Sequence, residues 1–532
     1  MTQVSAQKTD KLERPKLVVG IVVDQMRWDY LYRYYDRYTA GGFRRMMNEG
    51  YNCQNTMINY LPTFTGPGHA SIYTGTVPAI HGIASNDWID NRTGKEVYCV
   101  DDETVRTIGG GMEKTGMMSP RNMITTTITD ELEIVTQRKA KVFGIGLKDR
   151  GSILPAGHAA DAAFWFDDSS GNFITSTFYA KELPKWMQQF NDKRWTDTFM
   201  TKTWDLLYPA NTYTNSTADN MNVEGKLPGE DSSVFPHKTP NIKGKGYYGI
   251  RYMPWGNTLT LAAAMACVKG EHMGADDVPD FLAITLSTTD YAGHNYGPDA
   301  LEMEDMYLRL DMELAELMQY LDKQVGKGQY TVFLTADHGA AHNATYMKDL
   351  RIPSGTIPDK DANKGLHDYL KQTEGASELI RGMTNYQVYF DEEAIAKSSF
   401  DDERIKALVT QWLHSEEGVA YVVDMEDMDD AVVPETLRTM IVNGYYRERS
   451  GQLQIVMKPG WYSGHGETGT THGGWNPYDA HIPLLWYGWG INKGQTYRTV
   501  NMTDIAPTLA ALLHIQMPNG CIGNVISEVI KD

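Results

Sequence analysis

Three short runs of apolar residues along the chain are each followed closely by an aspartate. The runs and their aspartates are Leu17–Val23 with Asp24, Phe281–Leu286 with Asp290, and Thr331–Leu334 with Asp337. Short continuous apolar runs are typical of strands that are buried on both faces of a parallel sheet. Because ligand sites in open α/β proteins lie at the carboxyl ends of such strands, we expect the three aspartates to lie in a functional site.

Segments with helical spacing alternate with the apolar runs. We predict helices within 28–48, 258–269, 302–325 and 503–513, a helix that starts at Ala70–Tyr73 after a tight turn over 63–69, and further strands at 141–146 and 481–487. Strands that alternate with helices predict an α/β fold, here a doubly wound central sheet with helices on both faces.

Two segments differ from this pattern. Residues 167–250 are rich in Asn, Asp, Thr and Gly, and we interpret them as loops and short elements rather than core. Residues 345–455 contain predicted strands at 386–390 and 419–423 with a helix at 401–414 between them, which indicates an inserted α+β lobe. We therefore divide the chain into a catalytic core, 16–344 with 456–532, and a lobe, 345–455.

Composition and charge exclude some classes of partner. The chain has 532 residues, of which 41% are hydrophobic, so a large core can form. Its formal net charge of −19 makes the surface repel nucleic acid and anionic membranes, and we expect neither as a partner. The acidic surface is compatible with a monomer, which is the oligomeric state that we expect.

The chain shows no candidate membrane span, because no apolar run approaches the ~20 residues that a bilayer requires. The segment Met1–Pro15 is polar and lacks the apolar centre of a signal peptide. A cytosolic protein is one interpretation. We favour the other, a mature periplasmic or secreted protein whose leader is absent from this sequence.

The four cysteines, at 53, 99, 267 and 521, are too widely spaced for a cysteine zinc site. Cys53 and Cys99 are the candidate pair for a disulfide in an oxidising compartment.

Histidines accompany the strand-end aspartates. Asp290 and His294 have the spacing of one helical turn, so both can bind one ion. Asp337 and His338 are adjacent, and they can converge where the strand turns into a loop at Gly339. Carboxylate and imidazole ligands together favour Zn²⁺ over Mg²⁺ or Ca²⁺, which prefer oxygen ligands.

Other histidines are weaker candidates for the same site. His472 lies between Thr471 and Gly473, in a loop where glycine permits close backbone approach to a ligand. His69, His342 and His481 compete with it, and we interpret these three as supporting or structural residues.

Several strings together resemble the alkaline phosphatase superfamily, and within it the PafA-type bacterial alkaline phosphatases, which are related to nucleotide pyrophosphatase/phosphodiesterases. The matching strings are Val22–Met26, Thr63–His69, Ser85–Asp87, Lys148–Arg150, Asp290–His294, Ala336–Gly339, Thr471–Gly473 and, near the end of the chain, Asp504–Thr508. The resemblance covers nearly the whole chain.

The resemblance implies a phosphatase with two Zn²⁺ ions and no third ion. One ion would be held by Asp290, His294 and His472, and the other by Asp24, Asp337 and His338 with Thr65 beside it as the nucleophile. Asn86, Lys148 and Arg150 would contact the phosphoryl oxygens. The expected substrates are small phosphate monoesters, hydrolysed through a phospho-threonine intermediate.

The residue types suit this chemistry. A threonine hydroxyl is a weak nucleophile unless a metal ion lowers its pKa, and two metal ions can stabilise both ends of an in-line displacement. A monoester dianion has a non-bridging oxygen that a diester replaces with an ester group. The cations of Lys148 and Arg150 therefore favour monoesters.

Four alternatives fit these residues less well than a phosphomonoesterase does. A phosphodiesterase on the same scaffold has less use for Lys148 and Arg150. A sulfatase needs a Cys/Ser-x-Pro-x-Arg string, and the string here is Thr65-Gly66-Pro67-Gly68-His69, so we reject it. A phosphoglycerate mutase would use serine and a different insertion. A non-catalytic protein with this fold is disfavoured by the intact nucleophile and ligands.

Overall fold

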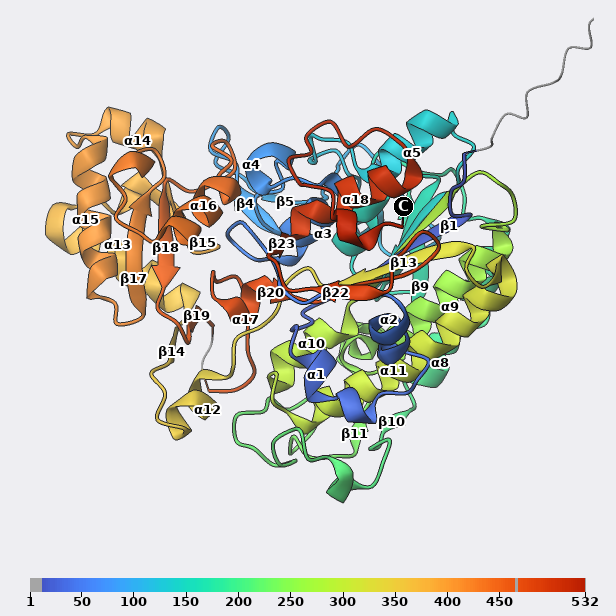
Figure 1. The fold of residues 1–532 in the computed structure, drawn as a ribbon. Coiled ribbons are helices and arrows are strands. Elements are labelled where there is room, and N and C mark those ends of the chain that lie inside the picture. The colour runs from blue at the N-terminus through green and yellow to red at the C-terminus, as the bar shows by residue number, and fades with distance from the viewer. Residues whose placement is uncertain (1–11, 465–466, 532) are drawn as a thin grey trace, which may run out of the picture.

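A ten-stranded mixed sheet runs through the larger part of the molecule (Figure 1), in a computed structural model that describes residues 12–464 and 467–531. Its centre is five parallel strands, in the order β13 (Tyr330–Thr335), β1 (Leu17–Val23), β12 (Asp280–Leu286), β7 (Val142–Gly146) and β8 (Ala162–Asp167). Every residue of these five strands is buried, which explains their continuous apolar sequences. The strands predicted from the apolar runs are confirmed.

Antiparallel strands extend this sheet at both sides. β21 (Leu484–Gly488) runs antiparallel to β13 and is followed by β2 (Tyr51–Cys53) and β22 (Gly494–Thr496). The strand predicted at 481–487 is split, because Pro483 separates β20 (His481–Ile482) from β21 and cannot donate to a ladder. On the other side, β9 (Asn172–Ser176) runs antiparallel to β8 and pairs with β6 (Thr107–Ile108).

Helices cover both faces of the sheet, which confirms the doubly wound architecture (Figure 1). One face carries α3 (Thr65–Thr74), α5 (Ile128–Thr136), α6 (Asp149–Ala156) and α18 (Ile505–Leu513). The other carries α2 (Phe43–Glu49), α9 (Trp255–Gly270), α10 (Thr288–Tyr296) and α11 (Leu301–Leu321). The helix predicted over 302–325 ends earlier than expected, in a π-turn at Asp322–Gly326. None of the helices in the described ranges is long and apolar enough to cross a bilayer.

The segment 167–250 differs from the prediction at its start. β9 is a strand of the main sheet, and Phe173 and Ile174 within it are buried. This strand was not predicted, because the preceding residues Ser169, Ser170 and Gly171 indicate only a turn. The rest of the segment consists of short elements as predicted: α7 (Lys185–Asn191), α8 (Trp195–Phe199), β10 (Thr203–Trp204), β11 (His237–Lys238) and short 3₁₀ turns.

A separate four-stranded sheet lies at one side of the molecule, at the left of Figure 1. Its order is β15 (Ile380–Thr384), β16 (Gln387–Phe390), β18 (Leu453–Met457) and β17 (Val419–Asp424). It packs with α13 (Asp359–Glu374) and α15 (Asp402–Ser415) around a hydrophobic cluster of its own, which includes Leu366, Val388, Ile405 and Val409. We refer to this sheet and its helices as the lobe.

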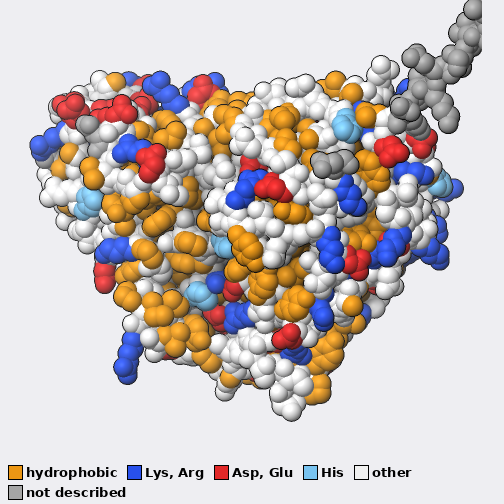
Figure 2. Space-filling view, viewed as in Figure 1, with side chains coloured by type: hydrophobic (Ala, Val, Ile, Leu, Met, Phe, Trp, Pro, Cys, Tyr) orange, Lys and Arg blue, Asp and Glu red, His pale blue; other side chains and the backbone are white. Residues whose placement is uncertain are grey.

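One helix of this part of the chain faces the main core. Leu437, Met440 and Ile441 of α16 (Glu435–Gly444) belong to the core cluster rather than to the lobe cluster. Figure 2 shows the surface from the same side as Figure 1. Acidic side chains gather on the outer end of the lobe, and histidine side chains reach the surface near the middle of this face.

The candidate pair Cys53 and Cys99 forms no disulfide in this structure. All four cysteines are free; Cys53, Cys99 and Cys267 are buried, and Cys521 is partly buried. Cys53 lies in β2 of the main sheet and Cys99 just after β5 (Glu96–Tyr98) of a small two-stranded sheet. The interpretation that a leader is absent is based on the segment Met1–Pro15, and residues 1–11 of this segment lie outside the described ranges.

Candidate metal centre

The three strand-end aspartates meet at one edge of the central sheet. Asp24 follows β1 directly, Asp290 lies in the first turn of α10 after β12, and Asp337 follows β13. β1 lies between the other two strands in register, so their carboxyl ends are level. All three carboxylates are almost completely buried. The expectation that the three strand ends deliver acids to one place is therefore met.

The first ligand group consists of Asp24, Asp337 and His338, whose ligand atoms all lie within 4.8 Å of one another. His338 Nε2 is 3.6 Å from Asp24 Oδ1 and 3.5 Å from Asp337 Oδ2. Both of these carboxylate oxygens are buried and accept no hydrogen bond. Buried acceptors without partners are costly, so this group fits a bound cation.

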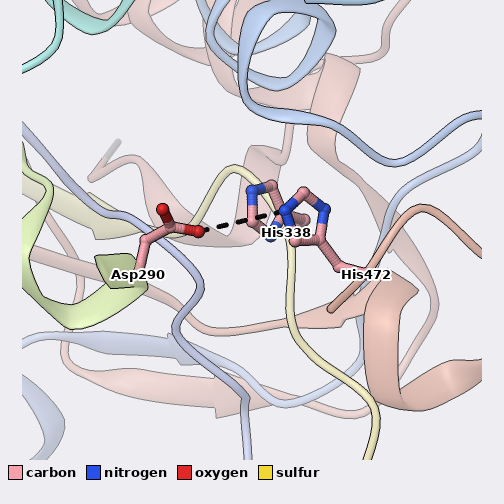
Figure 3. Close-up of side chains that lie close together, drawn as sticks. All are labelled: Asp290, His338 and His472. Atoms are coloured by element: carbon pink, nitrogen blue, oxygen red, sulfur yellow. Dashed lines mark ion pairs between the residues drawn. The ribbon is translucent and has the colours of Figure 1, made fainter. Parts of the chain in front are cut away.

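The second ligand group consists of Asp290, His338 and His472, again within 4.8 Å (Figure 3). The rings of His338 and His472 are stacked, with centroids 3.5 Å apart. His294 lies one turn after Asp290, with Nε2 3.1 Å from Asp290 Oδ1. The residues expected from the resemblance therefore surround Asp290, but His338 rather than His294 completes the compact group.

All three imidazoles present the same nitrogen to the carboxylates. Nδ1 of His294, His338 and His472 lies 2.8 to 2.9 Å from a backbone carbonyl oxygen, those of Thr470, Gly339 and Thr63. A carbonyl can only accept, so Nδ1 of each ring carries a proton. Although burial lowers the pKa of His294, the Asp290 carboxylate beside its Nε2 raises that pKa above its ordinary value. Burial lowers the pKa of His338 to about 4 and holds the pKa of His472 well below its ordinary value. Neutral imidazoles with Nε2 free are metal ligands.

Lys148 joins the two carboxylate groups. Its Nζ lies 2.7 Å from Asp24 Oδ2 and 2.6 Å from Asp290 Oδ2, and its side chain is 4% exposed. Although burial lowers the pKa of Lys148, these two carboxylates raise it above the ordinary value. One ammonium does not balance three carboxylates, and burial together with the Asp24 carboxylate raises the pKa of Asp337 well above its usual range. The carboxylates of the cluster therefore carry more negative charge than Lys148 neutralises, and further cations can bind there.

Thr65 is the first residue of α3, and its hydroxyl faces the ligand groups. Its side chain is buried, and Oγ1 lies 3.3 Å from His338 Nε2. The helix was expected to start at Ala70, but it begins at Thr65. Pro67 fits the first turn because the first N–H groups of a helix have no internal partner. A Cβ at Gly68 would lie 2.7 Å from the Asp337 Cβ, so glycine lets α3 approach that strand end closely.

Asn86 contacts the nucleophile turn. Its Oδ1 accepts a 2.7 Å hydrogen bond from the Gly66 N–H, which leaves the amide NH₂ for another acceptor. The structure places Arg150 in the first turn of α6, directly after Lys148 and Asp149. Its Nη1 donates to the Tyr98 hydroxyl at 3.0 Å, and its buried Nε has no hydrogen-bond partner.

Sequence reasoning missed the position of Gln25. Its backbone N–H donates to Asp337 Oδ1 at 3.1 Å, and its side-chain amide donates to Asp290 Oδ1 at 3.0 Å. Gln25 therefore ties the two ligand groups together from a left-handed backbone conformation, φ 63°. Its place immediately after the strand-end Asp24 is the signal that could have identified it.

The three competing histidines lie outside both ligand groups. His69 supports the site: Nδ1 lies 2.9 Å from the Thr65 carbonyl oxygen and 3.5 Å from Asp337 Oδ2. His342 pairs with Asp299 at 2.6 Å. His481 stacks on Trp28.

Comparison with known proteins places this geometry in a family. The model of the type I phosphodiesterase/nucleotide pyrophosphatase family matches residues 18–479. Alkaline phosphatase PafA of Elizabethkingia meningoseptica is 49% identical over 99% of this chain and 96% of its own length. A protein of Myroides odoratus named calcium-transporting ATPase is 48% identical over 98% of this chain and 96% of its own. A crystal structure of wild-type alkaline phosphatase PafA superposes with a TM-score of 0.94, covering 98% of this chain and all of the other at 49% identity.

Proposed function

The chain belongs to the type I phosphodiesterase/nucleotide pyrophosphatase family, and from this premise we propose that it is an alkaline phosphatase of the PafA type. It hydrolyses small phosphate monoesters of broad range and releases inorganic phosphate. One observation carries the proposal. The Thr65 hydroxyl lies 3.3 Å from Nε2 of His338, the imidazole that both Asp/His ligand groups share.

The ligands fit two Zn²⁺ ions. The site offers three carboxylates and three imidazoles, a mixture that suits zinc, whereas calcium prefers oxygen ligands alone. In this proposal Asp290, His294 and His472 hold one ion, and Asp24, Asp337 and His338 hold the other with Thr65. When bound, zinc supplies Lewis acidity that lowers the pKa of an oxygen nucleophile and stabilises a leaving oxygen.

Thr65 forms the covalent intermediate in this proposal. Its hydroxyl loses a proton, and Oγ1 forms a bond to phosphorus as the ester P–O bond breaks and the alcohol leaves with a proton. In the second step a water oxygen bonds to phosphorus and the bond to Thr65 Oγ1 breaks, which releases phosphate and restores the hydroxyl. The position at the start of α3 supports this role, because helix N-termini stabilise anionic groups.

Asn86, Lys148 and Arg150 bind the phosphoryl oxygens in this proposal. The free amide NH₂ of Asn86, the buried ammonium of Lys148 and the unpartnered Nε of Arg150 are donors near the nucleophile turn. Two cations stabilise the extra charge of a monoester more than they stabilise a diester. The family's name favours a second candidate, a phosphodiesterase or nucleotide pyrophosphatase, and these two cations distinguish the candidates.

We extend the proposal to the organisation of the protein. Residues 16–344 with 456–532 form the catalytic core, and 345–455 form an inserted lobe that limits access to the site. The protein acts as a monomer, because its charge of −19 makes copies repel one another. It acts in the periplasm or outside the cell.

The test compares hydrolysis of a matched aryl phosphate monoester and aryl phosphate diester, with zinc quantified in the same sample. We expect kcat/KM for the monoester to exceed that for the diester by several orders of magnitude, with about two zinc ions per chain. A chelator should abolish the activity, and added Zn²⁺ should restore it. Preference for the diester would favour the second candidate, and activity that survives removal of the metal would contradict both.

A further inference from the structure

A two-residue turn at the tip of the lobe hairpin β15–β16 adopts an unusual backbone conformation. Asn385 and Tyr386 join the two strands, and the flanking residues Thr384 and Gln387 pair directly. Both turn residues are left-handed, with φ of 57° and 59°. Tight hairpin turns require this conformation, and asparagine tolerates it, but a bulky tyrosine rarely adopts it. Such a residue is held in place by its surroundings, so its contacts indicate what it does.

Tyr386 contacts the backbone of the metal-ligand loop. Its hydroxyl donates to the His472 carbonyl oxygen at 3.3 Å and accepts from the Ser463 N–H at 3.1 Å. Its ring is nearly parallel to that of Phe64, with centroids 6.4 Å apart, and Phe64 in turn meets the His472 ring edge to face at 5.3 Å. Phe64 immediately precedes Thr65. Tyr386 therefore contacts two segments of the site, the loop that contains His472 and the residue that precedes Thr65.

Glycine at position 473 makes this contact possible. Gly473 has φ of 112°, and a Cβ there would lie 2.7 Å from the Tyr386 ring and 2.9 Å from the Phe64 ring. No side chain fits between the hairpin tip and the residue that follows His472. The ring of Tyr386 consequently rests directly on the ligand loop.

Asn385 reaches a different part of the site. Its Nδ2 donates to the Asp87 carbonyl oxygen at 2.6 Å, and Asp87 follows Asn86, whose amide contacts the nucleophile turn. Arg381 of the same hairpin donates to the carbonyl oxygens of Asp90 and Asn91 at 3.3 and 2.9 Å. The hairpin therefore holds the segment after Asn86 at more than one point.

The turn is firmly anchored in the lobe. The Tyr386 carbonyl oxygen accepts from the Ile455 N–H at 2.7 Å and from the Gln454 amide at 2.9 Å, both on β18. We propose that Asn385 and Tyr386 are positioning residues through which the lobe sets the active site, Tyr386 by fixing the His472 imidazole and Asn385 by fixing the Asn86 amide. This inference rests on the proposed function, and it predicts that substitutions of Asn385 and of Tyr386 have different effects.

Tyr386→Phe tests the first half, because it removes the hydroxyl and keeps the ring. Supporting contacts of metal ligands influence metal affinity by roughly 10- to 100-fold. We expect Zn²⁺ to bind Tyr386→Phe about 10-fold more weakly, measured by competition with a chromophoric chelator in the absence of substrate. The matched control is Tyr389→Phe, on the adjoining strand β16, whose hydroxyl donates to the Arg449 carbonyl oxygen at 3.1 Å. We expect Tyr389→Phe to bind zinc as the wild type does.

Asn385→Gly tests the second half, because glycine keeps the left-handed backbone and removes only the amide. We expect KM for the aryl phosphate and Ki for inorganic phosphate to rise roughly fivefold, the usual effect of one hydrogen bond, with zinc affinity unchanged. Zinc competition does not depend on turnover, so it decides the role of Tyr386 even if the chain hydrolyses no monoester.

Two results would overturn the inference. The first is equal zinc affinity for Tyr386→Phe and Tyr389→Phe. The second is an Asn385→Gly variant that weakens zinc binding as much as Tyr386→Phe does, since that would indicate general loosening of the lobe. Thermal unfolding of the three variants confirms that each is folded when zinc binding is measured.

Discussion

His338 and His472 stack face to face, with ring planes 12° from parallel. His338 is a member of both ligand groups, whereas His472 belongs to one. We therefore predict that His472→Ala retains about one of two zinc ions per chain, and that His338→Ala retains less metal than His472→Ala. Elemental analysis of the purified variants measures this difference. Equal zinc content in the two variants would show that His338 does not serve both groups.

The proposed role of Thr65 as the nucleophile can be tested separately from the proposed metal ligands. Thr65→Ala removes Oγ1 and leaves every carboxylate and imidazole in place. We expect zinc content to remain near that of the wild type and kcat for an aryl phosphate to fall by about three orders of magnitude or more, because the covalent route is lost. Thr65→Ser keeps a hydroxyl and is the matched control, with most activity retained. Wild-type turnover by Thr65→Ala would remove Thr65 from its role.

The proposed selectivity for monoesters over diesters can be tested at Arg150. Its guanidinium has a buried Nε without a partner and is oriented by the Tyr98 hydroxyl. We predict that Arg150→Ala lowers kcat/KM for an aryl monoester by about 10- to 100-fold and changes that for the diester far less. Lys327→Ala, which replaces an exposed cation at the other end of β13, is the control and should alter neither. Equal losses for the two esters would contradict monoester-specific recognition.

Lys148 stabilises the metal-free protein. Its ammonium lies within 2.7 Å of Asp24 and Asp290, and loss of one partner of a buried ion pair costs about 3–5 kcal/mol. We expect Lys148→Met to lower the Tm sharply in a chelator and less when zinc is present, because bound ions replace the missing charge. The measurement is the Tm of wild type and variant with and without zinc. A Tm decrease that zinc leaves unchanged would exclude this explanation.

A second buried charge cluster, away from the metal centre, makes stability fall at alkaline pH. His237 lies 3.1 Å from both Glu230 and Glu302; burial lowers its pKa, but these two carboxylates raise it to about 9. The raised pKa means that its contribution is complete below about pH 6.5 and is lost as pH rises through 9. Burial and Glu302 raise the pKa of Glu224 to about 8, which acts in the same direction.

The test replaces the titrating group. We expect the free energy of unfolding of the wild type to fall by up to about 3 kcal/mol more than that of His237→Gln between pH 7 and pH 10. Denaturant titrations at both pH values give these free energies. Parallel pH dependence in the two proteins would show that His237 does not titrate in this range.

The central strands, and the meeting of the aspartates that follow them, could be predicted because burial produces local patterns in the sequence. Strands buried on both faces are continuously apolar, and the aspartates that follow them need only the sheet topology to meet. The start of α3 was missed because Gly66, Pro67 and Gly68 indicate a turn in isolation. Packing on Asp337 and the free N–H groups of a first turn make the same residues suitable for a helix.

Contacts between residues that are far apart in the sequence could not be predicted from local patterns. Gln25 reaches Asp290, and Tyr386 reaches His472, through the three-dimensional arrangement alone. The local sequence also does not indicate that Arg150 lies in a helix, because Lys148 is the last extended residue before α6. Local sequence identifies residue types and periodicity, but it does not identify which remote backbone group a side chain will meet.

The lobe is inserted between His338 and His472, so the chain must complete this whole substructure before the two rings can stack. A growing polypeptide that has already made β1, β12 and β13 still lacks a ligand that only the last part of the chain provides. Assembly of this Asp/His centre is thereby coupled to completion of the chain, and incomplete translation products cannot assemble it.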